Sequence, residues 1–487
     1  MSDLEAPLET AQETWHRLSP KMLLIHPVSQ LLNALPQFIG LSVVGSFLGI
    51  DNWLLGIFGL AAGMGITRWF TTRLRITDSA VELKAGLVVR KTQATRRDRI
   101  RTVDVTARPL HRLLGVRMVV IGTGNNDSGG RLTLNGLSRE AAETLRFDLL
   151  HRAPQETEGE ELVRFDRSWV RYAPLTFSGV VGTGALGAFA FAGEGVLGYD
   201  LKDGLHSLAD SAQGVPLWAQ VAVVAVTLLL CAVLVSVSSY VLAYWGFHLV
   251  RPDAGTLQIS RGLMTTRTTS VEQRRLVGAT VSEPLGLRLV GAAKTSSIAT
   301  GLSDGSSSGG GSRLLVPPAP HGLAIAVAQR VLGSSAPAAP LLRHPRAALR
   351  RQVAGAVREA LWGLATAAVV VWFWAPTWVL LPAAAWLLLA PLIGFDRYLN
   401  LGHALTGGWL SSRTGSIERR RITLDTTAVI GWSTSCTLFQ RRLRLVTLTA
   451  ATAAGSGSYR IPDVDPDEAL RVMRSVSPAV VEPFALG

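Results

Sequence analysis

The sequence predicts an α+β membrane protein with six transmembrane helices in three hairpins, each hairpin followed by a cytoplasmic β domain that a C-terminal helix closes. Two observations predict it. The chain alternates three times between a long apolar stretch and a polar block. Each block also holds a fifteen-residue segment that begins with glycine and contains an arginine cluster, at 86–100, 262–276 and 408–422. Internal repeats of this kind indicate one structural unit per copy.

The composition supports a membrane protein. Hydrophobic residues make up 48% of the 487 residues and charged residues only 17%, which is more apolar than an ordinary soluble chain. The net charge is +13, and only five of the 48 basic residues are lysines. Such an excess fits an anionic partner, either lipid or nucleic acid. In a membrane protein the same excess also arises from arginines that hold the cytoplasmic side.

The two cysteines and the N-terminal segment have simple interpretations. Cys231 lies in an apolar run and Cys436 in the third block, so both are expected to be packing residues. The acidic N-terminus is not followed by a short apolar core with a small-residue cleavage site. A cleaved signal peptide is therefore not expected.

The third apolar stretch shows why hairpins are predicted. Ala360–Phe395 contains 36 residues without a charge. As one helix this stretch would be about 54 Å long, against a hydrocarbon core of about 30 Å. Pro376 lies near its middle, where a helix would break. Two spans joined by a turn fit better.

The first two stretches follow the same plan. Residues 28–70 carry Asp51 near the centre, and residues 172–247 divide into spans at Tyr172–Ala192 and Val221–Tyr244. Basic residues flank the outer ends of all three hairpins, whereas the turns within them hold only Lys202 among several acidic residues. Under the positive-inside rule the blocks and both termini are expected to be cytoplasmic, in a protein of the cell membrane.

These signals divide the chain into nine segments. The expected order is an N-terminal segment, three repeats of hairpin and block with a basic linker before the third hairpin, and a tail. Their bounds are 1–27, 28–70 (hairpin 1), 73–152 (block 1), 172–247 (hairpin 2), 249–333 (block 2), 334–358 (linker), 360–395 (hairpin 3), 397–477 (block 3) and 478–487.

Each block reads as short strands followed by one helix. In block 1, runs rich in Val, Ile and Thr alternate with Gly and Asn, which is typical of antiparallel strands. A closing helix is predicted over Ser138–Arg152 with Ser138 as N-cap. Asp465 and Pro466 predict the start of the helix in block 3, and Gly333 predicts the end of the helix in block 2.

Three passages resemble a known family. They are WHRLSPKMLLIHP at 15–27, RRDRIRTVDVTARPLHRLLGVRMVVI at 96–121 and VIGWSTSCTLFQRRLRLVTLTAATAAG at 429–455. With these passages the chain resembles the YdbS/YdbT-like bacterial PH-domain membrane proteins, and its three copies resemble the longer, YdbT-like member. The resemblance implies a PH-like fold for each block. It also implies a partner, a smaller membrane relative with one hairpin and one PH-like domain.

The second copy departs most from the pattern. Where copy one has Pro109–Arg112, copy two has Pro284–Leu287, and its arginine is displaced to Arg288. A Gly- and Ser-rich insertion follows Thr300 and reads as a flexible loop. Copy two is therefore expected to be the least able to bind a ligand.

No catalytic constellation is present in the sequence. The nine histidines show no metal-ligand spacing, and neither a nucleophile elbow nor a phosphate loop is found. We expect a non-enzymatic scaffold without a cofactor or metal, whose PH-like blocks bind partner proteins or inner-leaflet lipid. A transporter or export component and a lipid-modifying enzyme are the alternatives.

The candidate binding residues are the repeated arginines. Near a membrane each could attract anionic headgroups with about 1 kcal/mol. A solvated strand face or salt bridges between blocks would explain them equally well. Nucleic acid is not expected, because no aromatic residues are interleaved with them. The candidates are Arg96, Arg97, Arg99, Arg101, Arg274, Arg275, Arg419, Arg420, Arg421, Arg441 and Arg442.

Overall fold

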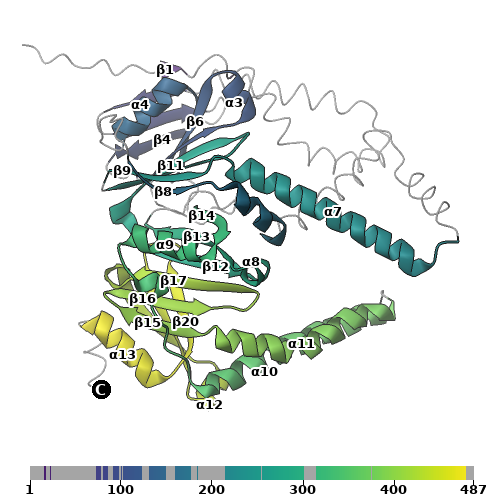
Figure 1. Ribbon diagram of the computed structural model, residues 1–487. Helices are drawn as coiled ribbons and strands as arrows, with labels where there is room; N and C mark the ends of the chain where they lie inside the picture. The colour runs from purple at the N-terminus through teal and green to yellow at the C-terminus, as the bar shows by residue number, and fades with distance from the viewer. Residues whose placement is uncertain are drawn as a thin grey trace, which may run out of the picture. The chain divides into compact units, whose positions relative to one another are not determined.

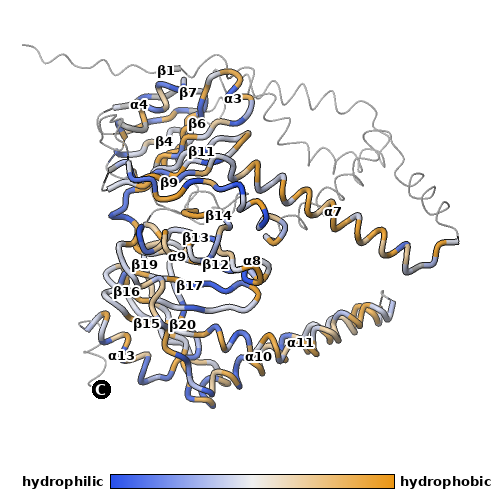
Figure 2. Tube along the Cα trace, viewed as in Figure 1, coloured by the Kyte–Doolittle hydropathy of each residue, from blue (hydrophilic) through white to orange (hydrophobic). Residues whose placement is uncertain are grey.

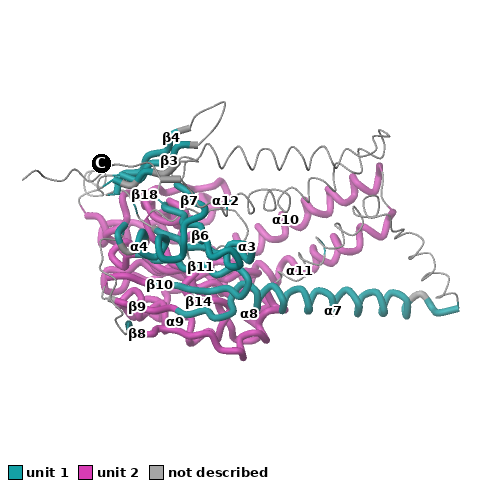
Figure 3. Tube along the Cα trace, turned by 90° about the horizontal axis from the view of Figure 1, so that it is seen from above, with its two compact units in different colours: residues 1–159, 177–248, 258–271 teal, residues 160–176, 249–257, 272–487 magenta. Residues whose placement is uncertain are grey.

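The computed structural model describes residues 16–17, 22, 73–77, 80–85, 91–97, 100, 102–122, 131–149, 159–176, 184, 214–253, 255–300, 314–373 and 376–478. Hairpin 1, Arg99, Arg101 and the Gly/Ser insertion lie outside this part. Contacts divide the chain into two compact units, shown in Figure 3. Unit 1 comprises Met1–Gly159, Phe177–His248 and Gln258–Val271, and unit 2 comprises Glu160–Thr176, Leu249–Leu257 and Glu272–Gly487.

The three copies share one order of elements, which can be followed in Figure 1. Three strands lead to a 3-10 turn, here called the corner. A fourth strand, a short helix, two further strands and the closing helix follow. Copy one comprises β2 (Arg73–Ile76), β3 (Ala80–Ala85), β4 (Lys91–Arg96), β5 (Thr102–Ala107), α3 (Pro109–Leu113), β6 (Val116–Gly122), β7 (Arg131–Ser138) and α4 (Arg139–Leu149).

The second and third copies repeat this order. Copy two comprises β9 (His248–Asp253), β10 (Thr256–Arg261), β11 (Thr266–Glu272), the corner η3 (Gln273–Arg275), β12 (Leu276–Pro284), α8 (Leu285–Leu289), β13 (Ala292–Ala299), β14 (Leu314–Pro320) and α9 (His321–Leu332). Copy three comprises β15 (Gly402–Thr406), β16 (Trp409–Thr414), β17 (Glu418–Asp425), the corner η6 (Thr426–Ala428), β18 (Val429–Ser435), α12 (Leu438–Arg442), β19 (Val446–Thr452), β20 (Ser458–Val464) and α13 (Pro466–Val476).

Smaller elements lie outside the three copies. They are β1 (His16–Arg17), β8 (Glu160–Arg164) and the 3-10 helices η2 (Arg167–Thr176), η4 (Ala336–Ala338) and η5 (Thr377–Val379). The order of three strands, a corner, three strands and a helix agrees with the predicted plan of each block. In copy one, Arg97 lies at the corner.

The closing helices begin and end where the sequence indicates. Ser138 accepts a hydrogen bond from the backbone N–H of Ala141 at 3.1 Å, and Asp465 accepts one from the N–H of Asp467 at 3.0 Å. Pro466 occupies the first turn of α13. Gly333 ends α9 in the left-handed region, at φ 63°. These three caps are confirmed, and each satisfies backbone groups that a helix end leaves open.

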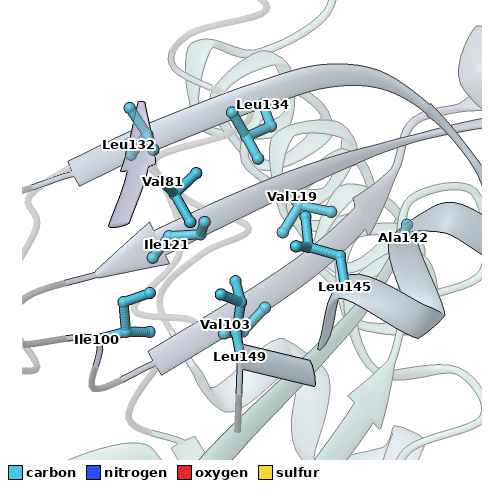
Figure 4. Packing of buried hydrophobic residues seen from close by; sticks show 10 residues of the cluster. All are labelled: Val81, Ile100, Val103, Val119, Ile121, Leu132, Leu134, Ala142, Leu145 and Leu149. Carbon is cyan, nitrogen blue, oxygen red and sulfur yellow. The ribbon is translucent and has the colours of Figure 1, made fainter. Parts of the chain in front are cut away.

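In unit 1 the core of copy one lies between its strands and α4. Figure 4 shows Val103, Val119 and Leu134 facing Leu145 of the helix, and all four side chains are buried. Val81 of β3 belongs to the same cluster. The closing helix thus covers an apolar interior made by both groups of strands.

Unit 2 contains two comparable cores. In copy three, Leu424 of β17 and Leu448 of β19 pack with Val472 of α13. In copy two, Val281 of β12 packs with Ala328 of α9. Each burial of an aliphatic side chain of this kind contributes about 1.5–3 kcal/mol.

The register of the third repeat differs from the prediction by seven residues. The strand just before the corner, β11 in copy two and β17 in copy three, is preceded by a turn that begins with glycine. This glycine is Gly262 in copy two and Gly415 in copy three, at φ 106° and 98°. A Cβ atom on either would lie 2.1 or 2.0 Å from the carbonyl oxygen three residues later. Gly408, on which the repeat was aligned from the sequence, lies in the preceding turn. Two successive turns that both begin with glycine made the wrong alignment possible.

Replacing Gly415 by alanine therefore should destabilise copy three more than replacing Gly408. Both glycines have positive φ, which costs an alanine about 1–3 kcal/mol. Only Gly415 adds an overlap with backbone, because a Cβ on Gly408 would meet nothing closer than 3.9 Å. Thermal unfolding of the two variants in detergent measures the difference. Equal losses would contradict the close approach of Gly415 to the carbonyl oxygen of Glu418.

Neighbouring copies are joined strand to strand. In unit 1, β5 of copy one pairs antiparallel with β11 of copy two, with Thr102 opposite Val271. In unit 2, β12 of copy two pairs antiparallel with β17 of copy three, with Thr280 opposite Ile422. In both joints the strand that follows the corner of one copy pairs with the strand that precedes the corner of the next. The division between the units falls inside the predicted domain 249–333.

These joints extend the sheets across the copies. Unit 2 contains a six-stranded sheet in the order β14-β13-β12-β17-β16-β15, and a three-stranded sheet in the order β18-β19-β20. In unit 1 the order β7-β6-β5-β11 follows the same rule. Copy three differs from the other two in that, among the described residues, β18 pairs only with β19.

Three helices within the described residues are long and apolar enough to cross a membrane. They are α7 (Leu217–Tyr244), α10 (Arg346–Phe373) and α11 (Leu380–Leu399), the last together with η5. Figure 2 shows their hydrophobic colouring. Large apolar side chains such as Leu229 and Trp372 are exposed on them, as expected of helices that face lipid. The other predicted spans lie wholly or mostly outside the described residues.

Two of the predicted boundaries fall within described elements. Tyr172–Thr176, predicted to begin a span, belongs to η2, where Tyr172 and Ala173 are buried in unit 2. Arg167 and Arg171 lie in the same 3-10 helix, before the predicted start of the span. Helix α10 begins at Arg346, inside the predicted linker 334–358. Its first turns carry the arginines that led us to expect a linker.

Helices α10 and α11 form a closely packed pair. Ala356 and Ala360 of α10 are buried against Ala390 of α11. A Cβ on Gly394 would lie 2.6 Å from the Cα of Val353, so only glycine allows this approach. Small residues at such contacts are typical of helix pairs in membranes. The break between the two helices falls at Pro376, as predicted.

Candidate binding sites in the polar blocks

The arginines of copy one lie around its corner. Arg96 ends β4 and is exposed. Arg97 forms an ion pair with Asp148 of α4, with the guanidinium nitrogen 2.8 Å from the carboxylate oxygen. This pair connects the corner to the closing helix. Arg97 is therefore engaged within its own block.

The arginines of copy two occupy the corner itself. Arg274 and Arg275 in η3 both donate to the carboxylate of Glu272, at 3.0 and 2.7 Å. The pKa of Glu272 is lowered although burial opposes this, because two guanidinium groups hydrogen-bond to its carboxylate. Arg274 remains largely exposed.

The arginines of copy three lie not at its corner but on β17, at the joint with copy two. Arg419 reaches the carboxylate of Glu283 on β12 at 3.3 Å, and Arg420 forms a surface pair with Glu418. Arg421 donates to the carbonyl oxygens of Ala336 and Ala339. Burial lowers the pKa of Arg421 to about 10. Arg419 and Arg421 thus stabilise the packing of unit 2.

The short helices share one pattern of burial. Their third residues His111, Leu287 and Gln440 are all buried. Each short helix is followed by a turn whose last residue has a positive φ. Arg112, Arg288 and Arg441 lie three residues before that last residue. Arg288 is displaced relative to the proline, as the sequence indicates, but it occupies the same position in the short helix as Arg112 and Arg441. The position of the arginine is therefore the same when counted from the start of the helix, and differs only when counted from the proline.

The next position of the short helix distinguishes copy three. Leu113 and Leu289 are exposed there, whereas copy three has Arg442. Arg442 lines a pocket of about 750 Å³ between α12 and the first turns of α10. The other arginines of this pocket, here called the base pocket, are Arg350, Arg351, Arg358 and Arg397. Arg441, the neighbouring candidate, is exposed and is not among the residues that line it.

A buried carboxylate fixes the walls of the base pocket. Asp463 is fully buried and accepts hydrogen bonds from Arg351 and Gln352 of α10, both at 2.6 Å. Its other oxygen accepts from Gln440 of α12 at 2.9 Å. Gln440 also completes a capping box with Thr437 at the start of α12. One carboxylate thereby connects α10, α12 and β20.

A pair of buried histidines continues this network. Nε2 of His344 lies 3.1 Å from Nδ1 of His403, and Nδ1 of His344 lies 3.1 Å from the carbonyl oxygen of Asp463. Because a carbonyl only accepts, Nδ1 of His344 carries the hydrogen. Burial lowers the pKa of His344 to about 4, and burial also lowers the pKa of His403. Among the described residues no group of acidic, His and Cys side chains is placed to hold a metal ion.

Comparison with protein families identifies these blocks. Residues 30–153 and 349–480 match the bacterial PH domain family, and together they cover just over half of the chain. The chain belongs to the bacterial PH domain family. No curated protein and no solved structure matches it. The first bacterial PH domain match contains copy one, and the second contains most of α10, all of α11 and copy three with the base pocket.

Sequence reasoning missed two features of the second bacterial PH domain match. The arginines of α10 were noted only as topology signals, since helical spacing does not show which of them face α12. The role of Asp463 could not be predicted from the sequence around it. Its partners on α10 lie more than one hundred residues away, and its partner on α12 is also not a neighbour in the sequence. Arg441 and Arg442 were predicted as binding residues; the structure leaves Arg441 outside the pocket, places Arg442 in its lining and buries the preceding Gln440.

Proposed function

We propose that this protein is a non-enzymatic, membrane-anchored scaffold whose bacterial PH domains bind partner proteins by strand pairing. The observation that carries the proposal is the repeated joint. Twice within the chain, the strand after a corner pairs with the strand before the next corner, in β5·β11 and in β12·β17. The third strand of this kind, β18, has no such partner among the described residues.

The exposure of β18 supports a strand that still lacks its pairing partner. Strand β12 is mostly buried within its sheet, whereas Ser433, Thr434 and Ser435 of β18 are exposed and Ile430 is 71% exposed. Edge strands are usually protected by lysine, proline or bulges. Strand β18 has a bulge only at its beginning, between Val429 and Gly431, and holds neither lysine nor proline. Its remaining edge is suited to accept another strand.

The partner that fits this edge is a further bacterial PH domain. Both internal joints use the strand before a corner as the incoming element, so the partner should supply the same strand. We propose that the smaller relative with one hairpin and one such domain supplies it, at the cytoplasmic face of the cell membrane. The apolar helices α7, α10 and α11 support membrane anchoring, and the arginines at the base of α10 support a cytoplasmic position for copy three.

Charged substitutions on β18 test the proposal. In cells that produce both proteins, the relative should co-purify with the wild-type chain in mild detergent. Replacing Ser433 and Ser435 by lysine should reduce the recovered relative about tenfold or more, which corresponds to about 1.4 kcal/mol or more. Lysine is what natural edge strands use against pairing. The thermal transition of the chain itself should be unchanged, because both side chains are exposed.

The matched control is Thr406→Lys on β15. This strand also forms an edge of its sheet, and Thr406 is exposed. The control should retain the relative at the wild-type level. Full retention by the Ser433→Lys/Ser435→Lys variant would contradict the proposal. A complex that contains two copies of this chain and no relative would contradict the choice of partner.

A further inference from the structure

We infer that the base pocket binds the phosphate headgroup of an anionic phospholipid. The inference rests on membrane anchoring as proposed above, but not on the pairing of β18. It concerns α10, α11 and α12, which all belong to unit 2. The pocket lies beside the first half of α10, where the arginines end and the uncharged part of the helix begins at Ala360.

The charge of the base pocket is strongly positive. Five arginines and one acidic residue, Glu359, line it. Arg397 binds both carboxylate oxygens of Glu359, at 3.2 and 3.0 Å, so the acid is neutralised in place. Arg351 is engaged by Asp463.

Three cations are left for a ligand. Arg350, Arg358 and Arg442 are exposed and have no carboxylate partner among the described residues. Arg358 lies over the ring of Phe439, with its central carbon 5.3 Å from the ring centroid. Guanidinium groups bind phosphate oxygens with two parallel hydrogen bonds. A convergent group of this kind, at the base of membrane helices, is suited to a lipid headgroup.

The apolar residues of the pocket favour a lipid over a free anion. Leu438 and Phe439 of α12 are 78% and 54% exposed, although both are large and apolar. They line the same pocket as the three arginines. A phospholipid matches this pairing, because its phosphate would lie among the arginines and the start of its acyl chains against the apolar side chains. A free phosphate would leave Leu438 and Phe439 uncovered.

The site is also held in a fixed shape. Asp463 binds both Arg351 of α10 and Gln440 of α12, so the two walls keep their separation without a ligand. Binding therefore does not have to order the two walls against each other, which avoids that entropic cost. Copies one and two have Leu113 and Leu289 at the position of Arg442, so the same pocket chemistry is not repeated in their short helices.

The test uses the full chain purified in a non-ionic detergent. Phosphatidylglycerol and phosphatidylcholine are added in separate samples, inorganic phosphate in a third, and bound lipid is counted by native mass spectrometry. Wild type should retain phosphatidylglycerol in preference to phosphatidylcholine. Removing one arginine should weaken binding about fivefold, and the Arg350→Gln/Arg442→Gln pair should weaken it about 25-fold.

Two controls are available in the chain itself. Arg346 and Arg441 are exposed arginines of the same two helices and do not line the pocket, so Arg346→Gln/Arg441→Gln should bind as wild type does. Arg350→Lys/Arg442→Lys should keep most of the binding. Equal phosphatidylglycerol retention by wild type and Arg350→Gln/Arg442→Gln would overturn the inference. Displacement of phosphatidylglycerol by millimolar inorganic phosphate would instead assign the site to a free anion, and would also overturn it.

Failure of this inference can be told apart from failure of the proposed scaffold. The substitutions in the base pocket leave β18 unchanged, so recovery of the smaller relative should not alter with them. Conversely, Ser433→Lys/Ser435→Lys should retain phosphatidylglycerol.

Discussion

Replacing Asp463 by asparagine should lower the free energy of unfolding of the third block by about 3–5 kcal/mol, the usual loss when one partner of a buried ion pair is removed. Asp463 is fully buried and pairs with Arg351, and it also accepts from Gln352 and Gln440. An asparagine amide would present N–H groups to at least one of these donors. Asparagine tolerates positive φ, as Asp463 requires at 60°, so the backbone itself adds little to the loss.

The matched control lies two residues further along the chain. Asp465 caps α13 through the N–H of Asp467, and asparagine caps helices about as well as aspartate. Asp465→Asn should therefore change the unfolding free energy by only a few tenths of a kcal/mol. Hydrogen exchange of β19 and β20 in detergent measures both variants. A loss at Asp463→Asn no larger than that at Asp465→Asn would show that the buried network does not stabilise the block.

Acid should destabilise the same block through His344. The folded-state pKa of His344 is about 4, below its ordinary value of 6.5, because the imidazole is buried. The unfolded chain therefore binds a proton more readily than the folded chain between these values. The stability is fully present above pH 6.5 and decreases as the pH falls towards 4, by roughly 3 kcal/mol in total. His403, whose pKa is also lowered, adds to the loss in the same direction.

A pH series on His344→Gln tests this origin. The groups facing His344 are His403 and the backbone of Asp463, while Glu468 lies 3.4 Å beyond on the other nitrogen of His403. A glutamine cannot take up the proton, so the variant should lose clearly less stability between pH 7 and pH 4 than wild type. Thermal unfolding in detergent at matched ionic strength gives the comparison. Parallel curves for the two proteins would assign the acid sensitivity to other groups.

The local elements could be read from the sequence because their signals are local. Ser138, Asp465 and Gly333 mark helix ends through hydrogen bonds and backbone conformations within a few residues. The break at Pro376 follows from the geometry of proline. Runs rich in Val, Ile and Thr between Gly and Asn likewise predicted the strands of block 1, which the structure shows as β3 to β7.

Features that depend on pairing across the chain could not be read in this way. The third repeat was aligned on Gly408 instead of Gly415, since the sequence does not show which glycine has the strained turn. The arginines of β17 looked like a repeated binding cluster, but Arg419 faces Glu283 across a strand pair between copies. The possibility of salt bridges between blocks was recognised, and the partners themselves required the three-dimensional structure.

The base pocket illustrates the same limit at a site. Arg442 was among the predicted binding residues, whereas Arg350 and Arg358 were seen only as a basic flank of hairpin 3. Their convergence depends on how α12 packs against α10, which Asp463 and Gln440 determine. Arg99 and Arg101 lie outside the described residues, so their role stays a prediction.

The most direct test of the scaffold is hydrogen–deuterium exchange of β18 with and without the smaller relative. In the chain alone, the amides of β18 that do not pair with β19 should exchange quickly, unlike those of the equivalent strand β12, which is paired on both sides. In the complex, we expect the exchange of β18 to slow to the level of β12, with little change in β15. Fast exchange of β18 in a complex that demonstrably contains the relative would contradict the proposed joint.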